Sequence, residues 1–174
     1  MLRHDPLRDP EQLIERVYAY VAYRIGGGAD AEDITSETFE RALRYRETYD
    51  PGKGTPVSWV LGIARRCTND ALARRKTTHL ELFEAQAPGD LEAETGDRLE
   101  LESALAQLPP DDFELLSLRY GADLSAKRIA EVLDSTPGAV RVALHRAHAR
   151  LRLLLEKGGR ETNPKASVQM RATP

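Results

Sequence analysis

Apolar side chains recur every three or four residues along nearly the whole of this sequence, which is the spacing of one face of an α-helix. Leu13, Val17 and Val21 follow this spacing near one end, and Val140 and Leu144 follow it near the other. The alternation typical of a half-buried strand is missing from the sequence, and glycine and proline fall between the periodic segments. The sequence therefore predicts an all-α fold.

Helix start and stop signals divide the first part of this pattern into three helices. Asp9 and Pro10 begin the first, which glycines 26–28 end. Asp30 is predicted to cap the second, which runs to about Tyr45. Thr55 is predicted to cap the third, which runs to about residue 76. The predicted inward positions are Leu13, Ile14, Val17, Val21, Ile25, Ile34, Phe39, Ala42, Leu43, Val57, Val60, Leu61, Ala64, Cys67 and Ala71.

A second helical cluster follows an acidic stretch that contains a Pro-Gly pair. Leu101, Leu105 and Leu108 share one face of its first helix, which the Pro-Pro pair at 109–110 stops. Residues 111–120 form the next helix, with Gly121 as its expected C′ residue. Ser125 is predicted to cap a third helix, and a last helix runs to about residue 157.

These signals predict two small helical domains joined by an acidic linker. The first domain covers residues 8–76, the linker 77–98 and the second domain 99–157. Residues 158–174 are polar, marked by glycine and proline, and nearly free of large apolar side chains, so they are predicted to be a disordered tail. In a chain of 174 residues, each domain is near the lower size limit for an independent core.

Charge is spread unevenly along the chain. The formal net charge is −3 at pH 7, yet residues 65–76 and 137–157 are rich in arginine and lysine, whereas residues 77–102 are rich in acids. Local basic surfaces are typical of proteins that bind polyanions. A single basic helix is more simply a solvated face, but two such helices, each closing a helical unit, favour nucleic-acid binding.

Composition argues against several other classes of protein. No apolar run reaches the length of a membrane span, and the first residues lack the apolar core of a secretory signal. Cys67 is the single cysteine, so no internal disulfide can form, and a reduced, cytoplasmic setting is expected. His145 and His148 are spaced i, i+3 but lack a third ligand, so we expect no metal and no cofactor.

The segment SAKRIAEVLDSTPGAVRVALHRA has the anatomy of a helix-turn-helix. Ile129 forms the inner face of its first helix, and Ala130 is small where two helices must cross. Asp134 stands at the turn, where short polar residues tolerate a left-handed backbone. In the second helix one stripe is predicted to be buried, namely Val140, Leu144, Ala147 and Leu151.

A different face of that second helix is basic and suits a DNA major groove. Arginine can bond guanine in a bidentate manner, and small apolar side chains can contact thymine methyl groups. Lys127 and Arg128, on the helix before the turn, suit phosphates, which position a protein without specifying sequence. The candidate base-contacting residues are Ala139, Arg141, Val142, His145 and Arg146.

The third predicted helix carries a second candidate surface. Trp59 lies at the edge of its apolar stripe, close to Arg66. Its simplest role is packing against a neighbouring helix, and its sharper role is to line a surface where unstacked bases are held between aromatic and basic groups. The second helix has an acidic stripe that includes Asp33 and Glu37, which is either a solvated face or the contact for a basic partner.

Taken in order, these segments resemble one family, the extracytoplasmic-function (ECF) sigma factors, two-domain initiation factors of bacterial transcription. DAEDITSETFERAL is similar to the part of region 2 that docks on the clamp helices of the polymerase β′ subunit. VSWVLGIARRCTNDALARRK is similar to the part that recognises and melts the −10 element. LESALAQLPPDDFELLSLRY with AKRIAEVLDSTPGAVRVALHRAHARLR is similar to region 4, which reads the −35 element. The match covers roughly residues 10–157.

The resemblance implies partners and a role for each candidate residue. Core RNA polymerase, through its β′ clamp helices, would be contacted by Asp30, Asp33 and Glu37. The opened −10 strand would lie near Trp59, Arg65, Arg66, Asn69 and Arg74. The −35 element would be met by Lys127, Arg128, Ala139, Arg141, Val142, His145 and Arg146. The second domain would also meet the β flap, and the linker would follow the RNA path.

The resemblance further implies an anti-sigma factor held between the two domains. Because polymerase performs the chemistry, the chain is expected to have no catalytic site. The sequence departs from the family at Ser36, where glutamine is usual, at Arg66, where asparagine is usual, and at Val142 and Ala143, where a hydroxyl residue and an arginine are usual. At these positions recognition is expected to differ from that of relatives.

Residue chemistry leaves two other functions open. A helix-turn-helix regulator acting alone would bind duplex DNA tightly as purified protein and would need a dimerisation surface, of which the sequence gives no sign. A helical interaction module would keep the fold without DNA contacts, so alanine at Arg141 and Arg146 would leave its activity unchanged.

Overall fold

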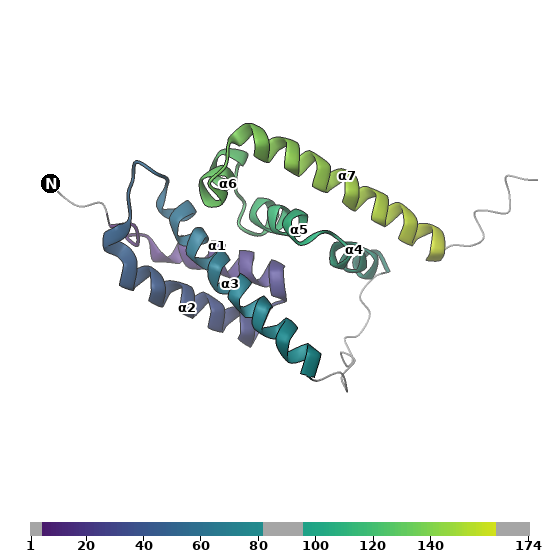
Figure 1. Cartoon of the computed structure of the whole chain (residues 1–174), viewed down its shortest axis with the longest axis horizontal. Coiled ribbons are helices and arrows are strands. Elements are labelled where there is room, and N and C mark those ends of the chain that lie inside the picture. The colour runs from purple at the N-terminus through teal and green to yellow at the C-terminus, as the bar shows by residue number, and fades with distance from the viewer. Residues whose placement is uncertain (1–4, 82–95, 163–174) are drawn as a thin grey trace, which may run out of the picture.

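The computed structural model describes residues 5–81 and 96–162, and these ranges contain helices and turns but no strand, as predicted. The helices are α1 (Pro10–Ile25), α2 (Ala29–Tyr45), α3 (Pro56–Glu81), α4 (Gly96–Ala106), α5 (Pro110–Leu116), α6 (Ala126–Leu133) and α7 (Pro137–Thr162). A 3₁₀ turn, η1 (Arg46–Thr48), follows α2, and a π-helical turn, η2 (Ser117–Gly121), follows α5. Figure 1 shows α1–α3 grouped apart from α4–α7.

Helices α1, α2 and α3 form the first helical unit around an apolar core. The predicted stripes are largely confirmed, with the following residues buried: Leu13, Val17, Val21, Ile34, Ala42, Val60, Leu61, Ala64, Cys67 and Ala71. Two predicted core positions are wrong, because Ile14 is 45% exposed and Leu43 is 55% exposed. Each follows a buried residue directly, and one step turns a side chain by about 100° around the helix. Tyr20, which periodicity missed, is fully buried.

Helices α4 to α7 with η2 form the second helical unit. Leu108, Ile129, Val140, Leu144 and Ala147 are buried as predicted, while Leu105 and Leu151 pack against this core and are partly buried. Leu101, in the middle of the short helix α4, is 40% exposed and does not join this core, contrary to the prediction. Leu116, Leu118 and Leu124 complete the core.

Three of the four predicted cap residues stand at the predicted helix starts, although Asp9 does so without a side-chain bond, and the assignment of Asp30 is wrong. The hydroxyl of Thr55 accepts a hydrogen bond from the backbone N–H of Ser58 at 3.3 Å, and Ser125 caps α6 in the same way at 3.4 Å. Asp9 makes no side-chain cap hydrogen bond. The N-cap of α2 is Gly28, whose φ of 96° favours glycine, so Asp30 falls inside the first turn.

Both long helices extend further than predicted. Helix α3 reaches Glu81, and α7 reaches Thr162, two residues before the next proline in the sequence. The predicted linker 77–98 therefore overlaps the ends of α3 and α4, and its remaining part, residues 82–95, lies outside the described residues. The predicted tail likewise begins inside α7, and residues 163–174 lie outside the described ranges.

Gly121 does not have the role that the sequence predicted for it. The expected helix over residues 111–120 divides into α5 and η2, Gly121 lies inside η2, and the positive φ of 50° belongs to Asp123. A Cβ at Gly121 would lie 3.1 Å from the carbonyl oxygen of Ala19 and 3.2 Å from the Cα of Tyr20, both on α1. Glycine is therefore required by the close approach of the first unit.

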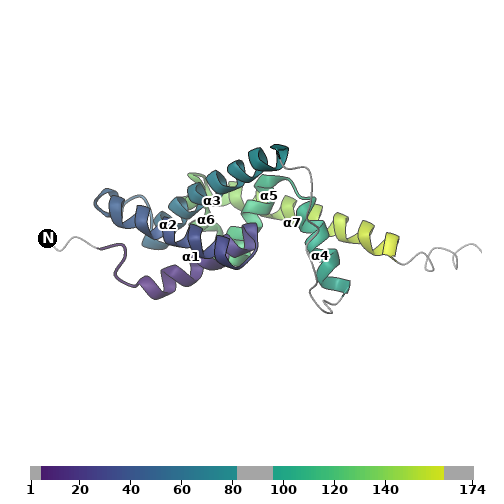
Figure 2. The same ribbon diagram turned by 90° about the horizontal axis from the view of Figure 1, so that it is seen from below.

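The two helical units pack directly on each other, which the sequence did not predict. Helix α1 packs on η2, and α3 packs on α6. Figures 1 and 2, at right angles to each other, both show α6 beside α3 and α7 on the far side of the second unit. The candidate binding surfaces therefore belong to one packed molecule rather than to two separate units.

Candidate nucleic-acid interface

Helices α6 and α7 form the predicted helix-turn-helix. Asp134 ends α6 with φ 50° and ψ 52°, the left-handed conformation predicted for it. The N–H of Ser135 then donates to the carbonyl of Ala130 at 2.9 Å, which closes the turn. Thr136 starts α7 by accepting a hydrogen bond from the N–H of Ala139 at 3.2 Å. The turn thus rests on backbone and side-chain bonds that short polar residues supply.

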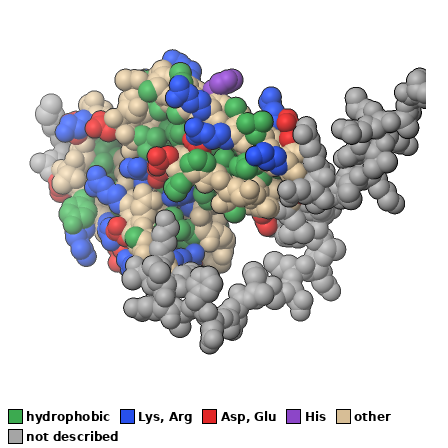
Figure 3. All heavy atoms as spheres, turned by 45° about the vertical axis from the view of Figure 1, so that its right-hand side comes forward, with side chains coloured by type: hydrophobic (Ala, Val, Ile, Leu, Met, Phe, Trp, Pro, Cys, Tyr) green, Lys and Arg blue, Asp and Glu red, His purple; other side chains and the backbone are tan. Residues whose placement is uncertain are grey.

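The predicted base-contacting residues form one exposed surface, which we call the recognition face. It consists of Ala139, Arg141, Val142, His145 and Arg146, all of them exposed. Val140, Leu144 and Ala147 point the other way into the core, so the first turns of α7 are held rigidly. Figure 3 shows a histidine and several lysine or arginine side chains at the top of the molecule, where Figure 1 places α6 and α7. This face is basic and open.

A shallow hollow beside the recognition face adds a residue that the sequence reading missed. Arg119 lines it together with Ser125, Arg141, His145 and His148. The guanidinium of Arg119 donates to the carbonyl of Leu124 at 2.7 Å, which fixes its position. Its positive charge was the sequence signal of a binding role. Arg119 belongs to η2, however, and only the fold brings it next to α7.

The two residues predicted for phosphate contacts have different surroundings. Lys127 is exposed. Arg128, which is partly buried, donates from its guanidinium to the hydroxyl of Thr55 at 2.9 Å, in the first unit. The structure therefore leaves Lys127 exposed on α6 and turns Arg128 toward α3.

The −10 candidates Trp59 and Arg66 line a cavity of about 650 Å³, which we call the aromatic cavity. The ring of Trp59 meets that of Tyr49 edge-on, with centroids 5.6 Å apart. The loop that includes Tyr49 and Lys53 forms part of the wall of this cavity. The sequence did not predict a role for this loop, although its aromatic and basic residues were a signal of one. The opposite wall belongs to the second unit, through Glu131, Val132 and Asp134 of α6 and its end.

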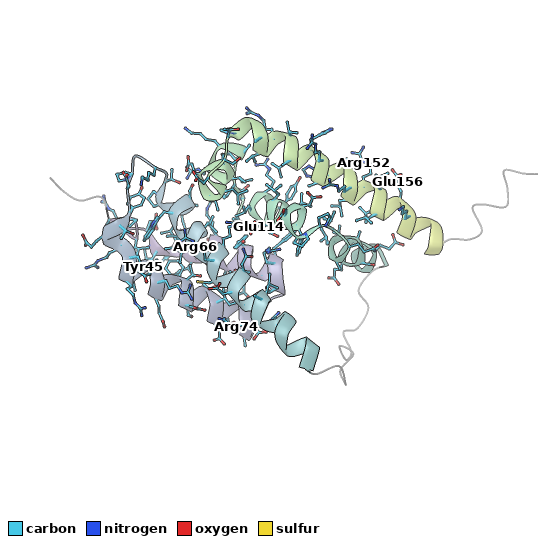
Figure 4. All side chains as sticks on the ribbon, viewed as in Figure 1. Tyr45, Arg66, Arg74, Glu114, Arg152 and Glu156 are labelled. Atoms are coloured by element: carbon cyan, nitrogen blue, oxygen red, sulfur yellow. The ribbon has the colours of Figure 1, made fainter. Side chains whose placement is uncertain are left out.

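The remaining −10 candidates lie elsewhere on α3. The guanidinium of Arg65 bonds the carboxylate of Glu114 on α5 at 3.0 Å. Asn69 accepts a hydrogen bond from Arg24 at 3.1 Å. Figure 4 labels Glu114 between the two units and Arg74 near the lower end of α3. The five candidates on α3 thus divide among three sites and do not form one surface.

Arg74 lines a hollow with the predicted polymerase contacts, namely Asp30, Asp33 and Glu37. Asp30 forms an ion pair with Arg75, and Glu37 bonds Arg41 at 2.5 Å. Asp33 is exposed. This acidic stripe is therefore partly neutralised by arginines of the same unit, and it faces away from α6 and α7.

Cys67 is fully buried in α3, and burial raises the pKa of its thiol. Among residues 5–81 and 96–162, no group of three or more His, Cys, Asp or Glu side chains is arranged to hold a metal ion. Within the same ranges none of the helices combines the length and apolar character that crossing a bilayer requires. The chemistry of the described surface is that of charged and aromatic groups.

Family models match both halves of the chain in the expected order. Sigma-70 region 2 matches residues 11–78, and sigma-70 region 4 matches residues 98–151. The first match holds the acidic stripe and most of the aromatic cavity, and the second holds the helix-turn-helix. Both interfaces therefore lie inside matched segments.

Several curated relatives are similar over most of this chain. It is 34% identical to the ECF RNA polymerase sigma factor BldN of Streptomyces coelicolor, over 86% of this chain and 60% of BldN. It is 32% identical to the RNA polymerase sigma factor CarQ of Myxococcus xanthus, over 80% of this chain and 83% of CarQ. It is 34% identical to SigE of Mycolicibacterium smegmatis, over 87% of this chain and 62% of SigE. The chain thus spans less than two thirds of BldN and SigE but most of CarQ.

Two solved structures share the fold. The sigma factor RpoE of Bartonella quintana, in complex with the anti-sigma factor NepR, superposes with a TM-score of 0.63 at 20% identity, over 83% of this chain and 92% of that one. CnrH, in complex with the cytosolic domain of CnrY, superposes with a TM-score of 0.58 at 22% identity, over 86% and 84% of the two chains.

Proposed function

Since this chain belongs to the ECF sigma factors of the sigma-70 family, we propose that it binds core RNA polymerase and directs it to promoters. The observation that carries the proposal is the open recognition face on a rigid helix-turn-helix within the region 4 match. Arg141 and Arg146 are exposed there at the start of a helix, where arginines can reach base edges in a major groove.

The −35 element meets the recognition face in this proposal. Arg119, beside this face, and Lys127, exposed on the helix before the turn, contact flanking phosphates, which fix the register of the helix on DNA. Val142, 51% exposed, gives an apolar contact where the family resemblance implies a hydroxyl residue, so the preferred −35 sequence differs from that of relatives.

The −10 strand enters the aromatic cavity of the first unit. A base that leaves the stack can lie against Trp59 and Tyr49, while Arg66 and Lys53 neutralise the backbone. Arg65, Asn69 and Arg74 lie outside the cavity, at two other sites on α3, and contact other parts of the strand. Melting is favoured because aromatic stacking replaces part of the lost base stacking.

Core polymerase meets the acidic stripe in this proposal. Asp33 is exposed for a basic partner, and Asp30 and Glu37 exchange their arginine partners for those of polymerase. The β flap contacts the second unit. Bond formation belongs to polymerase, so this chain acts without catalytic residues, in the cytoplasm. An anti-sigma factor binds and controls it, a partner of the kind that RpoE of Bartonella quintana has in its complex with NepR.

Run-off transcription with core polymerase of the source organism, on a library spanning that genome, tests the proposal. We expect promoter-dependent transcripts only when the protein is added. The double substitution Arg141→Ala/Arg146→Ala should reduce them about tenfold or more, because each base contact contributes about 1–3 kcal/mol. Arg152→Ala, on an exposed position of α7 that Figure 4 labels far from its first turns, is the matched control. Absence of both transcripts and core binding would refute the proposal.

A further inference from the structure

A hollow of about 590 Å³, which we call the Arg24 hollow, lies where α1 and α3 meet α4 and α5. Most of its wall is apolar, and the residues that supply this part are Leu72, Leu105, Leu108, Pro110 and Phe113. Small-molecule sites in proteins typically measure roughly 300–1,000 Å³, have mostly apolar walls with a few polar groups, and often lie between domains. The Arg24 hollow has the size, the wall and the location of such a site.

Arg24 of α1 is a cation of this hollow without an acidic partner. Its Cζ lies 5.5 Å from the centroid of the Phe113 ring, which is within the range of a cation–π contact. One of its Nη groups donates to the side-chain oxygen of Asn69 at 3.1 Å. Its Nε–H is screened from solvent and has no acceptor, and Arg24 makes no ion pair with any acid of the described ranges. A partly buried guanidinium in these surroundings lacks a counter-charge.

Two residues of α3 add further hydrogen-bond donors to the wall. Asn69 accepts from Arg24 with its Oδ1, so the NH₂ group of the same amide remains for another acceptor. Arg65 donates from its Nε to the buried carboxylate of Glu114 at 3.0 Å, which uses one of its five N–H bonds. Figure 4 labels Glu114 between the two units. The hollow is thus lined by donors from three side chains and by a buried carboxylate that already has its partner.

The partly buried charges of the hollow do not cancel. Arg24 and Arg65 each carry a positive charge and Glu114 carries one negative charge, so one positive charge is left over. Asp111 also lines the hollow, but its side chain is exposed and solvent screens its charge. A ligand with a single negative charge would balance this excess.

We propose that the Arg24 hollow binds a small organic acid, whose carboxylate pairs with Arg24 and whose apolar body lies against Leu105, Leu108 and Phe113. A planar guanidinium can hold a carboxylate by two parallel hydrogen bonds, and a small turn of the Arg24 side chain lets its Nε–H form one of them. The amide of Asn69 donates to the same carboxylate. This inference goes beyond the sigma-factor function and does not depend on it, because the free protein contains every residue of the site.

Phenylacetate is the probe, and two related compounds separate the contributions of charge and apolar body. Phenylacetamide keeps the shape but lacks the charge, whereas acetate keeps the carboxylate but lacks the ring. Two-dimensional proton–nitrogen NMR of the full-length protein at low chloride follows the Nε–H of Arg24 and the side-chain amide of Asn69. We expect saturable shifts of both signals with phenylacetate, and an affinity about tenfold lower for each of the other two compounds.

Two substitutions remove the site by different means. Arg24→Gln removes the charge but keeps a hydrogen-bonding side chain. Ala106→Trp fills the hollow with a large ring from an exposed position at the end of α4. Each should weaken phenylacetate binding about tenfold or more, the first through the lost charge-assisted bonds and the second through steric exclusion. Arg44→Gln, at an exposed arginine of α2 that does not line the hollow, is the matched control and should bind as the wild type does.

Several outcomes would overturn the proposal. One is the absence of saturable shifts with phenylacetate, and another is unchanged binding by Arg24→Gln or Ala106→Trp. Equal affinity for phenylacetamide would remove the role of the Arg24 charge. Equal affinity for acetate would mean that a bare carboxylate, such as an acidic side chain of a protein partner, is enough. Circular dichroism identifies a variant that has lost helix; if Arg24→Gln does so, Ala106→Trp decides.

The test is separate from that of the proposed function, because it needs neither polymerase nor DNA. A protein that binds phenylacetate in this way but gives no promoter-dependent transcript refutes the sigma-factor function alone. A protein that supports transcription but does not bind phenylacetate refutes the organic-acid site alone.

Discussion

The recognition face on α7 and the candidate −10 residues on α3 both belong to long basic helices, yet their charges are used differently. Among the described residues, Arg141 and Arg146 make no ion pair, whereas Arg65 and Arg75 of α3 are paired with Glu114 and Asp30. The recognition face offers its charge to a partner outside the chain, although Arg150 further along α7 is paired with Asp112. Helix α3 satisfies much of its charge within the chain. A basic segment in a sequence therefore becomes a binding surface only where the fold leaves it unpaired.

The largest expected effect tests whether the two units depend on each other for stability. Leu61→Ala in the first unit and Ile129→Ala in the second each remove a fully buried side chain. Each should lower the free energy of unfolding by about 2–5 kcal/mol. Urea unfolding measures the free energy, and amide hydrogen exchange shows which helices lose protection.

If the two units stabilise each other through the α1–η2 and α3–α6 contacts, both should lose protection against hydrogen exchange in either variant. Protection lost only in the unit that carries the substitution would mean that the interface contributes little, and the contrast between the units would then be one of charge alone. Ile14→Ala, at an exposed position, is the control and should change stability little.

The next effect compares the open face with the covered cavity directly. Arg141→Ala should weaken binding to a −35 duplex by about 1–3 kcal/mol with free protein, because its surface is open. Arg66→Ala should change the binding of free protein to this duplex little. It should weaken promoter binding only in the complex with polymerase, where the −10 strand enters the cavity. Fluorescence anisotropy with and without core polymerase measures both; equal losses for free protein would contradict the contrast.

A smaller effect concerns the turn that orients the recognition face. Asp134 has a left-handed backbone, which costs most L-residues about 1–2 kcal/mol and glycine almost nothing. Asp134→Ala should therefore lower the midpoint of thermal unfolding, whereas Asp134→Gly should leave it nearly unchanged. A larger loss in the glycine variant would show that the Asp134 side chain, rather than its backbone, matters.

The sequence predicted what depends on local rules. Periodicity identified the core positions of α3 and α7, and capping preferences identified Thr55, Ser125 and the left-handed Asp134. Ile14 and Leu43 were misplaced because periodicity gives the centre of a stripe better than its width. The assignment of Asp30 as a cap failed because a glycine two residues earlier could adopt φ 96°.

The relation between the units could not be predicted, because it depends on pairs far apart in the chain. In the sequence Glu131 is an ordinary helical neighbour of Lys127 and Arg128, and it meets Ser58 only after both units have folded. Gly121 was predicted to end a helix because glycine is common at helix C-termini. In the structure its neighbour is the backbone of α1. Candidate residues were thus found by chemistry, but their grouping into sites required the fold.

The smallest expected effect is a dependence of the packing between the two units on acid. Partial burial acts to raise the pKa of Glu131, but hydrogen bonds from Ser58 and Thr55 and the charges of Arg128 and Lys127 outweigh it, so its pKa lies below the ordinary 4.5. Units packed through Glu131 therefore bind the proton less well than separated units do. This contribution to the packing is complete above pH 4.5 and is lost as the pH falls through the lowered pKa.

Scattering curves between pH 6 and pH 3 should thus show the wild type expanding below about pH 4.5. Other carboxylates line the same cavity, including those of Asp50 and Asp134, so the comparison with Glu131→Gln is essential. That variant should be more open at neutral pH and should lack the part of the expansion that belongs to Glu131. If the radius of gyration of both proteins rises equally as the pH falls, the carboxylate of Glu131 does not hold the units together. Their association then depends on the packing of Gly121 against α1.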